Sequence, residues 1–236
     1  MNGLHIRFEG LTASYPYPFL RSGTAISLPL PPYSSIFGML SACAGYDIYP
    51  NGILIGFEFT SGERRSIDLE RTDRLQTDQK GRLRTNPQQG ISRREFHVYP
   101  KLDVYLSDRS LKPIFENPIA TPRFGRSQDL AWISSVVEID FTPVESGAVR
   151  ATLVPYPDVP IGQILPPLVD YYFNDWERQT RVAARTSRYA AMPDPKPSHS
   201  LAISGFEVRA TSRIRLYHPS DSTFQEHAII LMDFQS

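Results

Sequence analysis

The sequence lacks a second cysteine and lacks any long apolar run. The first absence excludes an internal disulfide, and the second excludes a membrane-spanning helix. Cys43 cannot form an internal disulfide, and its neighbours Met39, Leu40 and Ala44 predict a small buried side chain rather than a nucleophile. No stretch approaches the roughly 20 apolar residues that cross a bilayer, and the N-terminus lacks the basic and apolar segments of a signal peptide. We therefore expect a cytoplasmic globular protein, for which a hydrophobic content of 41% over 236 residues is ordinary.

Lysine is also scarce. Only four of the 25 basic residues are lysines, namely Lys80, Lys101, Lys112 and Lys196, and the other 21 are arginines. Because the planar guanidinium binds phosphate with two hydrogen bonds and stacks on bases, this bias favours RNA as a partner. A high-GC codon usage would produce the same bias without any RNA.

Acidic residues are few between positions 71 and 94, although the whole chain has a formal net charge of zero. The segment holds only Asp73 and Asp78, against seven basic residues: Arg71, Arg74, Lys80, Arg82, Arg84, Arg93 and Arg94. This local excess of positive charge concentrates the attraction for a polyanion on one segment. A solvated insertion would explain the polarity of the segment but not its shortage of acids, whereas phosphate contact predicts both.

Alternation of apolar and polar residues predicts core strands at residues 4–8, 53–59 and 102–106. Between the first two, Ser34 or Ser35 is expected to cap a helix that ends at Gly45 and buries one face. That face consists of Ile36, Met39, Leu40 and Cys43. A short second helix is expected at 110–117, and further strands at 136–141, 149–154, 201–209, 213–218 and 228–234 make the second half β-rich.

A third helix is expected over residues 174–191. Asn174 followed three residues later by Glu177 resembles a capping box, and Pro193 lies just past the end. Four arginines then recur at a spacing that would place them on one helical face: Arg178, Arg181, Arg185 and Arg188. Such a stripe, almost without acidic partners, could bind RNA or an acidic neighbouring protein.

The expected order of elements, β-α-β, a hairpin and then β-α-β, fits an α+β fold of the ferredoxin-like, RNA-recognition type. We assign residues 1–145 to this domain, with the basic hairpin inserted at about 63–98. Residues 146–236 are assigned to a β-rich C-terminal part that carries the arginine-striped helix.

Prolines precede the first expected helix at positions 29, 31 and 32. They hold the chain extended, so that the helix begins at a fixed place with free backbone N–H groups at Ser35, Ile36 and Phe37. Such groups attract phosphate. The alternative is that the prolines only connect a loop to a buried helix.

The sequence shows no metal-ligand spacing among its five histidines, no glycine-rich phosphate loop and no serine elbow. We therefore expect no metal and no cofactor. A metal-independent ribonuclease could use His97 as a general base, with Lys101 and Tyr33 to stabilise the phosphorane. The stretch REFHVYPKLDVYL equally fits the rim of a core strand, which is the interpretation that we prefer.

Two stretches resemble a known family. LPLPPYSSIFGMLSACAG, residues 28–45, is similar to the proline-rich approach to the helix in the RAMP-type CRISPR-associated proteins of Cas family five. PRFGRSQDLA, residues 122–131, is similar to the Gly-Arg-Ser turn of the same proteins. Together the two matches anchor roughly the first 140 residues. The size of the chain and the lack of further domains look most like the type I-B branch.

The resemblance implies a subunit that caps the 5′ handle of the CRISPR RNA (crRNA) in a type I Cascade complex, in antiviral defence. One branch of the family, type I-C, cuts precursor RNA itself, but no basic-histidine pair can be matched in this sequence, so we expect a noncatalytic protein. The resemblance also implies a ferredoxin-like domain whose inserted hairpin, the thumb, reaches over the crRNA. It further implies, as partners, the backbone subunit of Cas family seven and the large subunit of Cas family eight, with target DNA bound only indirectly through the guide, and no membrane.

Patterns and resemblance together predict these RNA-binding residues: Tyr15, Arg21, Tyr33, Ser34, Ser35, Arg71, Arg74, Lys80, Arg82, Arg84, Arg93, Arg94, Arg126 and Ser127. Tyr15 and Arg21 would contact exposed bases and phosphates, for which packing of their loop onto the domain is the alternative. Two rival functions stay open. One is an endoribonuclease that processes precursor crRNA, and the other is a scaffold that binds only proteins.

Overall fold

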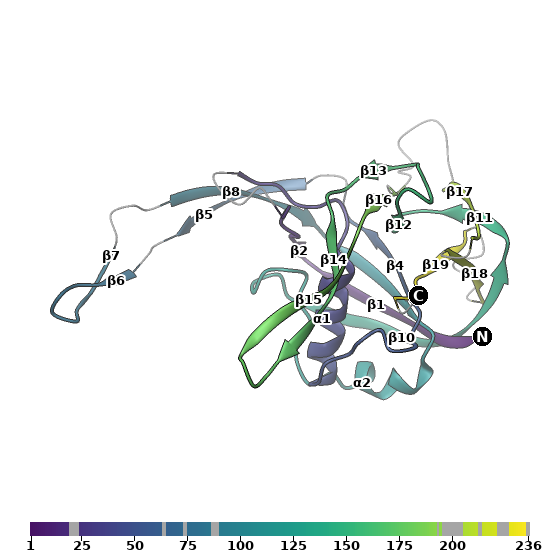
Figure 1. Cartoon of the computed structure of the whole chain (residues 1–236), viewed down its shortest axis with the longest axis horizontal. Helices are drawn as coiled ribbons and strands as arrows, with labels where there is room; N and C mark the ends of the chain where they lie inside the picture. Colours follow the sequence, from purple (N-terminus) through teal and green to yellow (C-terminus); the bar gives the residue numbers. More distant parts are fainter. Residues whose placement is uncertain are drawn as a thin grey trace.

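A six-stranded antiparallel sheet forms the centre of the molecule (Figure 1). In spatial order its strands are β19 (Ile229–Leu231), β18 (Arg215–Pro219), β10 (Ala131–Val144), β1 (Asn2–Gly10), β9 (Lys101–Leu106) and β4 (Ile55–Thr60). The structure is a computed structural model that describes residues 1–18, 24–62, 65–72, 75–85, 90–192, 194, 205–211, 214–220 and 227–234. The core strands expected at 4–8, 53–59 and 102–106 are confirmed as β1, β4 and β9.

Alternating residues of the central strands bury one face of the sheet. Leu4, Ile6 and Phe8 of β1 lie opposite Leu106, Val104 and Leu102 of β9, and all six are buried. Helix α1 (Tyr33–Ala44) follows β1, and the short helices η1 (Arg109–Leu111) and α2 (Lys112–Glu116) follow β9. The first two of the three expected helices are thus present. No helix in the described part of the chain is long and apolar enough to span a membrane.

Helix α1 begins earlier than the sequence predicted. Its N-cap is Pro32, whose carbonyl accepts hydrogen bonds from the N–H groups of Ser35 (2.9 Å) and Ile36 (3.3 Å). The prediction that Ser34 or Ser35 is the cap is therefore wrong, because both serines already belong to the first helical turn. The N–H groups of Ser35 and Ile36 are also not free for phosphate, and only Tyr33 and Ser34 precede the first intrahelical bonds. Gly45 ends the helix as predicted.

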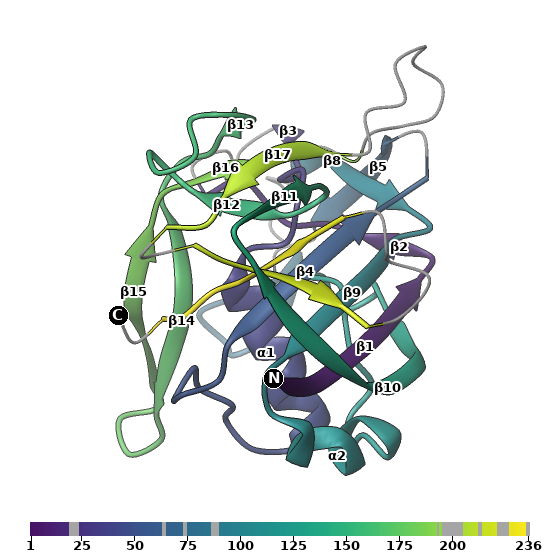
Figure 2. The same ribbon diagram turned by 90° about the vertical axis from the view of Figure 1, so that its right-hand side faces the viewer.

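The central sheet curls until its two edge strands meet. The backbones of Ile55 on β4 and Met232 after β19 exchange two hydrogen bonds, of 3.1 and 2.8 Å. Figure 2 shows β18 and β19 crossing in front of β4 and β9. Gly56 permits this close approach, because a Cβ there would lie 2.1 Å from the carbonyl oxygen of Ile230.

Two hairpins and several short strands complete the molecule. A long hairpin pairs β5 (Arg65–Thr72) with β8 (Gly90–Val98), and continues in β6 (Leu75–Thr77) and β7 (Leu83–Thr85). Beside it lie β2 (Thr12–Ala13) and β3 (Thr24–Ala25). The C-terminal half adds β11 (Ser146–Val149), β12 (Leu153–Pro155), β13 (Gln163–Ile164), β16 (Tyr189–Ala191) and β17 (Phe206–Arg209).

The helix predicted over residues 174–191 is wrong, because this region is a β-hairpin. Strand β14 (Leu168–Asp175) pairs antiparallel with β15 (Thr180–Ser187). The turn is fixed by the Asp175 carboxylate, which accepts the N–H of Arg178 at 3.0 Å, and by Gln179, whose φ is 53°. The side chain of Asn174 caps no helix and instead donates to Asp47 (2.6 Å). Aromatic and β-branched residues such as Tyr172 and Val182 favour strands, and cross-strand pairing decides the structure.

We predict that Gly56→Ala lowers the free energy of unfolding by about 3 kcal/mol, because the new methyl group would push β19 away from β4. The matched control is Gly52→Ala. Gly52 has a φ of 75°, but a Cβ there would have no atom within 4 Å, so only the backbone cost of about 1 kcal/mol applies. Urea denaturation measures both. Equal losses in the two variants would contradict the close crossing of β19 over β4.

Candidate nucleic-acid interface

A groove of about 850 Å³ lies along α1. Its lining comes from residues 15, 16, 18, 28 and 32 before α1, the outer side of α1, residues 120–125 and the β14–β15 hairpin. We call it the α1 groove. In Figure 1 the β14–β15 hairpin lies across α1, consistent with the packing of Phe37 on Tyr171. Four segments that are distant in the sequence therefore meet around one helix.

Small side chains on α1 keep the groove open. Ser34, Gly38 and Ala42 follow one another at every fourth position, so they lie on one side of the helix and all line the groove. A Cβ on Gly38 would have only the Arg181 guanidinium within 4 Å, at 3.8 Å. Nothing in the packing therefore requires glycine here, and its small size leaves space above the helix.

Two arginines give the groove its positive charge. Arg181 lies 4.4 Å above the centre of the Tyr172 ring, in a cation–π contact. Arg123 lines the groove from the loop after α2. Neither guanidinium forms an ion pair with any residue that the structure describes. Ser34, Ser35 and Tyr15, which the sequence predicted to bind RNA, also line this groove, although the ring of Tyr15 is buried.

We call the hairpin of strands β5, β6, β7 and β8 the arm; it extends away from the central sheet (Figure 1). Not all of its cations are free. Arg94 is paired with Glu70 (2.7 Å), and Arg84 with Asp78 (2.9 Å). Lys80, Arg82 and Arg93 are exposed and form no ion pair within the described residues. Arg21, Arg74 and the side chain of Arg71 fall outside the described part of the structure.

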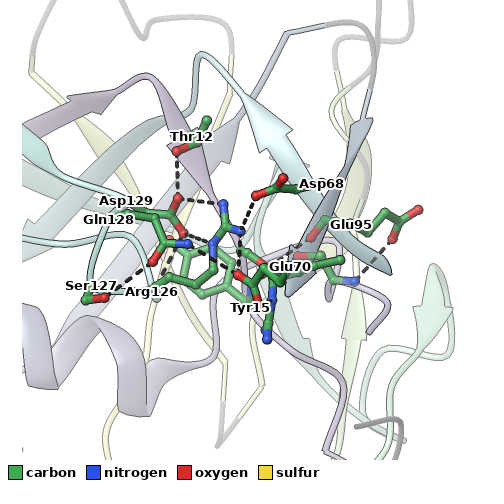
Figure 3. A network of polar contacts seen from close by, with 12 residues as sticks. Thr12, Tyr15, Asp68, Glu70, Glu95, Arg126, Ser127, Gln128 and Asp129 are labelled. Carbon is green, nitrogen blue, oxygen red and sulfur yellow. Dashed lines mark hydrogen bonds and ion pairs between the residues drawn. The ribbon is translucent and has the colours of Figure 1, made fainter. Parts of the chain in front are cut away.

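The base of the arm is fixed by Arg126 (Figure 3). Two nitrogens of its guanidinium bind the Asp129 carboxylate at 2.8 and 2.9 Å, and the third binds Glu70 at 3.2 Å and Asp68 at 3.5 Å. Asp129 has no exposed surface and also accepts the Thr12 hydroxyl at 2.6 Å. We call these residues the Arg126 cluster. Because Asp68 and Glu70 belong to β5, the cluster joins the turn at 123–129 to the arm.

Because of the Arg126 cluster, the arginine of the Gly-Arg-Ser turn is bound within the protein itself. Arg126 was expected to bind RNA, yet its guanidinium is engaged by three carboxylates and lies on the ring of Phe96. Burial alone would raise the pKa of Glu70, but the hydrogen bonds from Arg94 and Arg126 hold it below its ordinary value. Gly125 has a φ of 105°, and a Cβ there would meet the Ser14 carbonyl at 2.1 Å. Ser127 stays exposed beside the cluster.

Two residues of the catalytic hypothesis are buried. Tyr33 packs against Phe57 and Phe234, and burial raises the pKa of its hydroxyl far above the ordinary value, so the hydroxyl stays protonated. His97 is buried with Nε2 at 2.9 Å from the Leu28 carbonyl oxygen. Lys101 is exposed and lies 3.9 Å from Glu9. No group of three potential metal ligands gathers among the residues described.

The four arginines expected on one helical face are separated by the hairpin. Arg178 is in the exposed turn and pairs with Asp175 (3.7 Å), whereas Arg181 enters the α1 groove. Arg185 donates to the Phe234 carbonyl (2.9 Å) and lies 3.4 Å from the buried Asp170 carboxylate. Arg188 is exposed before β16. Only Arg181 thus joins the groove.

Gly38, Arg123 and Tyr172 are among the groove residues that sequence reasoning missed. Arg123 stands in the quoted turn beside Gly125, but the pattern drew attention to Arg126 instead. Tyr172 could not be recognised from the sequence, because its contact with Arg181 exists only once the hairpin has formed.

No model of a known protein family matches this chain, and no curated protein matches it in sequence. Solved structures do share its fold. One, described as a CRISPR RNA-guided surveillance complex, aligns over 81% of this chain and 90% of its own, at 16% identity and a TM-score of 0.53. Another, a CRISPR protein from Archaeoglobus fulgidus, aligns over 98% of this chain and 100% of its own, at 12% identity and a TM-score of 0.50. The predicted resemblance to CRISPR proteins is therefore confirmed for the fold.

We predict that Arg126→Gln lowers the free energy of unfolding by about 3 kcal/mol, because it leaves the fully buried Asp129 carboxylate without its cation. Arg123→Gln, three residues away, should change stability by less than about 0.5 kcal/mol, since Arg123 has no ion pair in the described structure. Thermal and urea unfolding measure the difference. A loss no larger for Arg126→Gln than for Arg123→Gln would show that the cluster does not hold the arm.

Tyr33→Phe should raise the free energy of unfolding by about 1 kcal/mol. The Tyr33 hydroxyl is buried and has no hydrogen-bond partner in the described structure, so its removal relieves an unpaired polar group. The neighbouring ring of Tyr189 gives the matched control. Its hydroxyl donates to Asp170 at 2.6 Å, so Tyr189→Phe should cost about 1.5 kcal/mol. Changes of the same sign in both variants, measured by urea unfolding, would refute this assignment.

Proposed function

We propose that this chain is a RAMP-type protein of Cas family five, which binds the 5′ handle of crRNA as a subunit of a type I Cascade complex, of branch I-B. The observation that carries the proposal is the α1 groove, where two arginines without a carboxylate partner in the described structure line one cavity at the N-terminal half of α1. The fold shared with a CRISPR RNA-guided surveillance complex supports it.

The strand order supports the ferredoxin-like assignment. The units β1-α1-β4 and β9-α2-β10 interleave in the sheet as β10-β1-β9-β4, with every neighbouring pair antiparallel. This is the arrangement expected of two split β-α-β units. The arm is inserted between β4 and β9, at the position where the thumb is expected.

Single-stranded RNA fits the chemistry of the groove. Arginine forks bind phosphate, and the N-terminus of a helix adds a partial positive charge, here at Tyr33 and Ser34. The Tyr172 ring holds the Arg181 guanidinium from beneath, and such a planar guanidinium is a surface on which unpaired bases stack. The RNA strand would thus run along α1, with phosphates on Arg123 and Arg181.

The arm offers two further surfaces. Lys80 and Arg82 would bind RNA phosphates beyond the groove. Ile67, Leu69 and Ile91 lie on one side of the β5–β8 ribbon and are 62%, 66% and 69% exposed. Arg93 pairs with Leu69 across the ribbon, so it lies on this same apolar side. Branched aliphatic side chains suit a protein surface better than bases, so this side would pack against the Cas family seven backbone subunit. The Cas family eight subunit would complete the particle, with target DNA bound through the guide.

A noncatalytic role is part of the proposal. The burial of His97 and Tyr33 supports it, because a general base has to reach the proton of its substrate. The competing function is an endoribonuclease that processes precursor crRNA. It would be favoured by defined cleavage of a precursor transcript in EDTA that disappears in His97→Ala.

The test is the affinity for a single-stranded handle RNA as a function of salt. Arg123→Gln and Arg181→Gln should each weaken binding about tenfold, since each removes one charge-assisted phosphate contact. Each should also reduce the slope of log K against log salt by about 0.7, the value for one phosphate of a single strand. The matched control is Arg215→Gln, because Arg215 is paired with Asp233 at 3.2 Å on β18, away from the groove.

Unchanged affinity and slope in both groove variants would overturn the proposal for the groove. Loss of binding only in a Lys80→Gln/Arg82→Gln variant would move the RNA site to the arm. If the unaltered chain showed no salt-dependent binding of RNA at all, a scaffold that binds only proteins would be the better account.

A further inference from the structure

A second cavity of about 350 Å³ adjoins the α1 groove. We call it the side pocket. Both cavities share the α1 residues Ser34, Gly38 and Ala42, together with Tyr172 and Arg181. The side pocket then continues toward the C-terminal end of α1, the loop at 46–49 and the turn of the β14–β15 hairpin. The Arg181–Tyr172 pair therefore stands where one cavity passes into the other.

The side pocket is held in shape by one carboxylate. Asp47 accepts hydrogen bonds from Asn174 Nδ2 (2.6 Å), Tyr49 Oη (3.0 Å) and Trp176 Nε1 (3.3 Å). These bonds tie the hairpin to the loop after α1. Trp176 is 70% exposed, yet its indole N–H is bound, so the ring is oriented rather than left to rotate freely. Tyr46, 56% exposed, lines the same pocket.

The floor of the side pocket is made of small residues. Gly38, Ser41 and Ala42 lie on one side of α1, Gly45 follows them as the C-cap of the helix, and all four line the cavity. A helix that only packed against the hairpin would be expected to fill this space with larger apolar side chains. Here the space stays open beneath two exposed aromatic rings.

The polar atoms of the side pocket are mainly acceptors. The Asp47 carboxylate offers more lone pairs than its three donors use, and the Asn174 amide contributes its carbonyl oxygen, because its nitrogen donates to Asp47. A ligand that carries amino or N–H donors would be favoured over one that carries only acceptors at the same edge. Arg181, at the boundary, can bind an anionic group outside the pocket.

From these features we infer that one nucleobase of the RNA strand turns out of the α1 groove into the side pocket. The base stacks on Trp176, its phosphate lies on Arg181, and its exocyclic amino group donates to the Asp47 and Asn174 oxygens. Adenine, cytosine and guanine each carry an exocyclic amino group and therefore fit the site better than uracil, which has carbonyl oxygens on either side of its single N–H. This inference rests on the proposed RNA-binding function and adds a position at which that RNA is recognised by its base.

The chain allows a direct optical test, because it has only two tryptophans, Trp132 and Trp176. In a Trp132→Phe background, all tryptophan emission comes from Trp176. We expect oligonucleotides of about 10 residues of A or C to quench this emission on binding, and oligo-U to bind without quenching. Trp176→Ala should weaken oligo-A binding about tenfold, the loss expected for one stacked base. Trp176→Phe, which keeps an aromatic ring, should recover part of it.

Failure of this inference differs from failure of the proposed function. If oligo-A binds and Arg181→Gln weakens it, but Trp176→Ala binds as tightly as the unaltered chain and Trp176 emission does not change, no base enters the side pocket. Equal quenching by oligo-U and oligo-A would refute the selection by Asp47 and Asn174. If no oligonucleotide binds the unaltered chain, both the RNA-binding function and the base site are refuted. Circular dichroism of each variant verifies that exposed Trp176 can be replaced without unfolding.

Discussion

The buried carboxylate of Asp129 has to be neutralised, and this requirement organises the surface of the molecule. Its partner Arg126 reaches from the same turn to Asp68 and Glu70 on β5, so this guanidinium, with the amide of Gln128, joins the turn to the arm. Removing a buried charge from its partner costs several kcal/mol, which makes the arrangement rigid. Because the turn also carries Arg123, the Arg126 cluster fixes both the arm and one side of the α1 groove.

Pairing divides the arginines of this chain into two groups with different roles. Arg94, Arg126 and Arg185 are bound to carboxylates or backbone carbonyls, and so stabilise the protein itself. Arg123 and Arg181 lack such partners within the described residues and line a cavity beside a helix N-terminus. The arginine-rich composition therefore contributes to the fold as much as to any interface. In the proposed function the phosphate contacts are made by cations that lack internal partners, not by the segment where cations are most dense in the sequence.

Local sequence patterns predicted the strands and the helix whose formation depends on neighbouring residues in the chain. Strands β1, β4 and β9 follow from alternation, and α1 from its apolar spacing and Gly45. The hairpin β14–β15 could not be recognised, because arginines three and four residues apart fit a helix as well as a strand, and the deciding contacts, such as Asn174 with Asp47, are distant in sequence. For the same reason Arg126 was assigned to RNA, since no pattern shows that Asp68 and Glu70 would engage it.

The central claim is that single-stranded RNA lies along α1, between the turn at 123–129 and the β14–β15 hairpin. Photocrosslinking of the full chain to a thiouridine-substituted handle RNA, followed by mass spectrometry of the crosslinked peptides, tests it most directly. The account predicts crosslinks in peptides that contain Met39 or Tyr172, both of which line the groove. Crosslinks confined to the arm or to the central sheet around β18 and β19, with none in those two peptides, would contradict it.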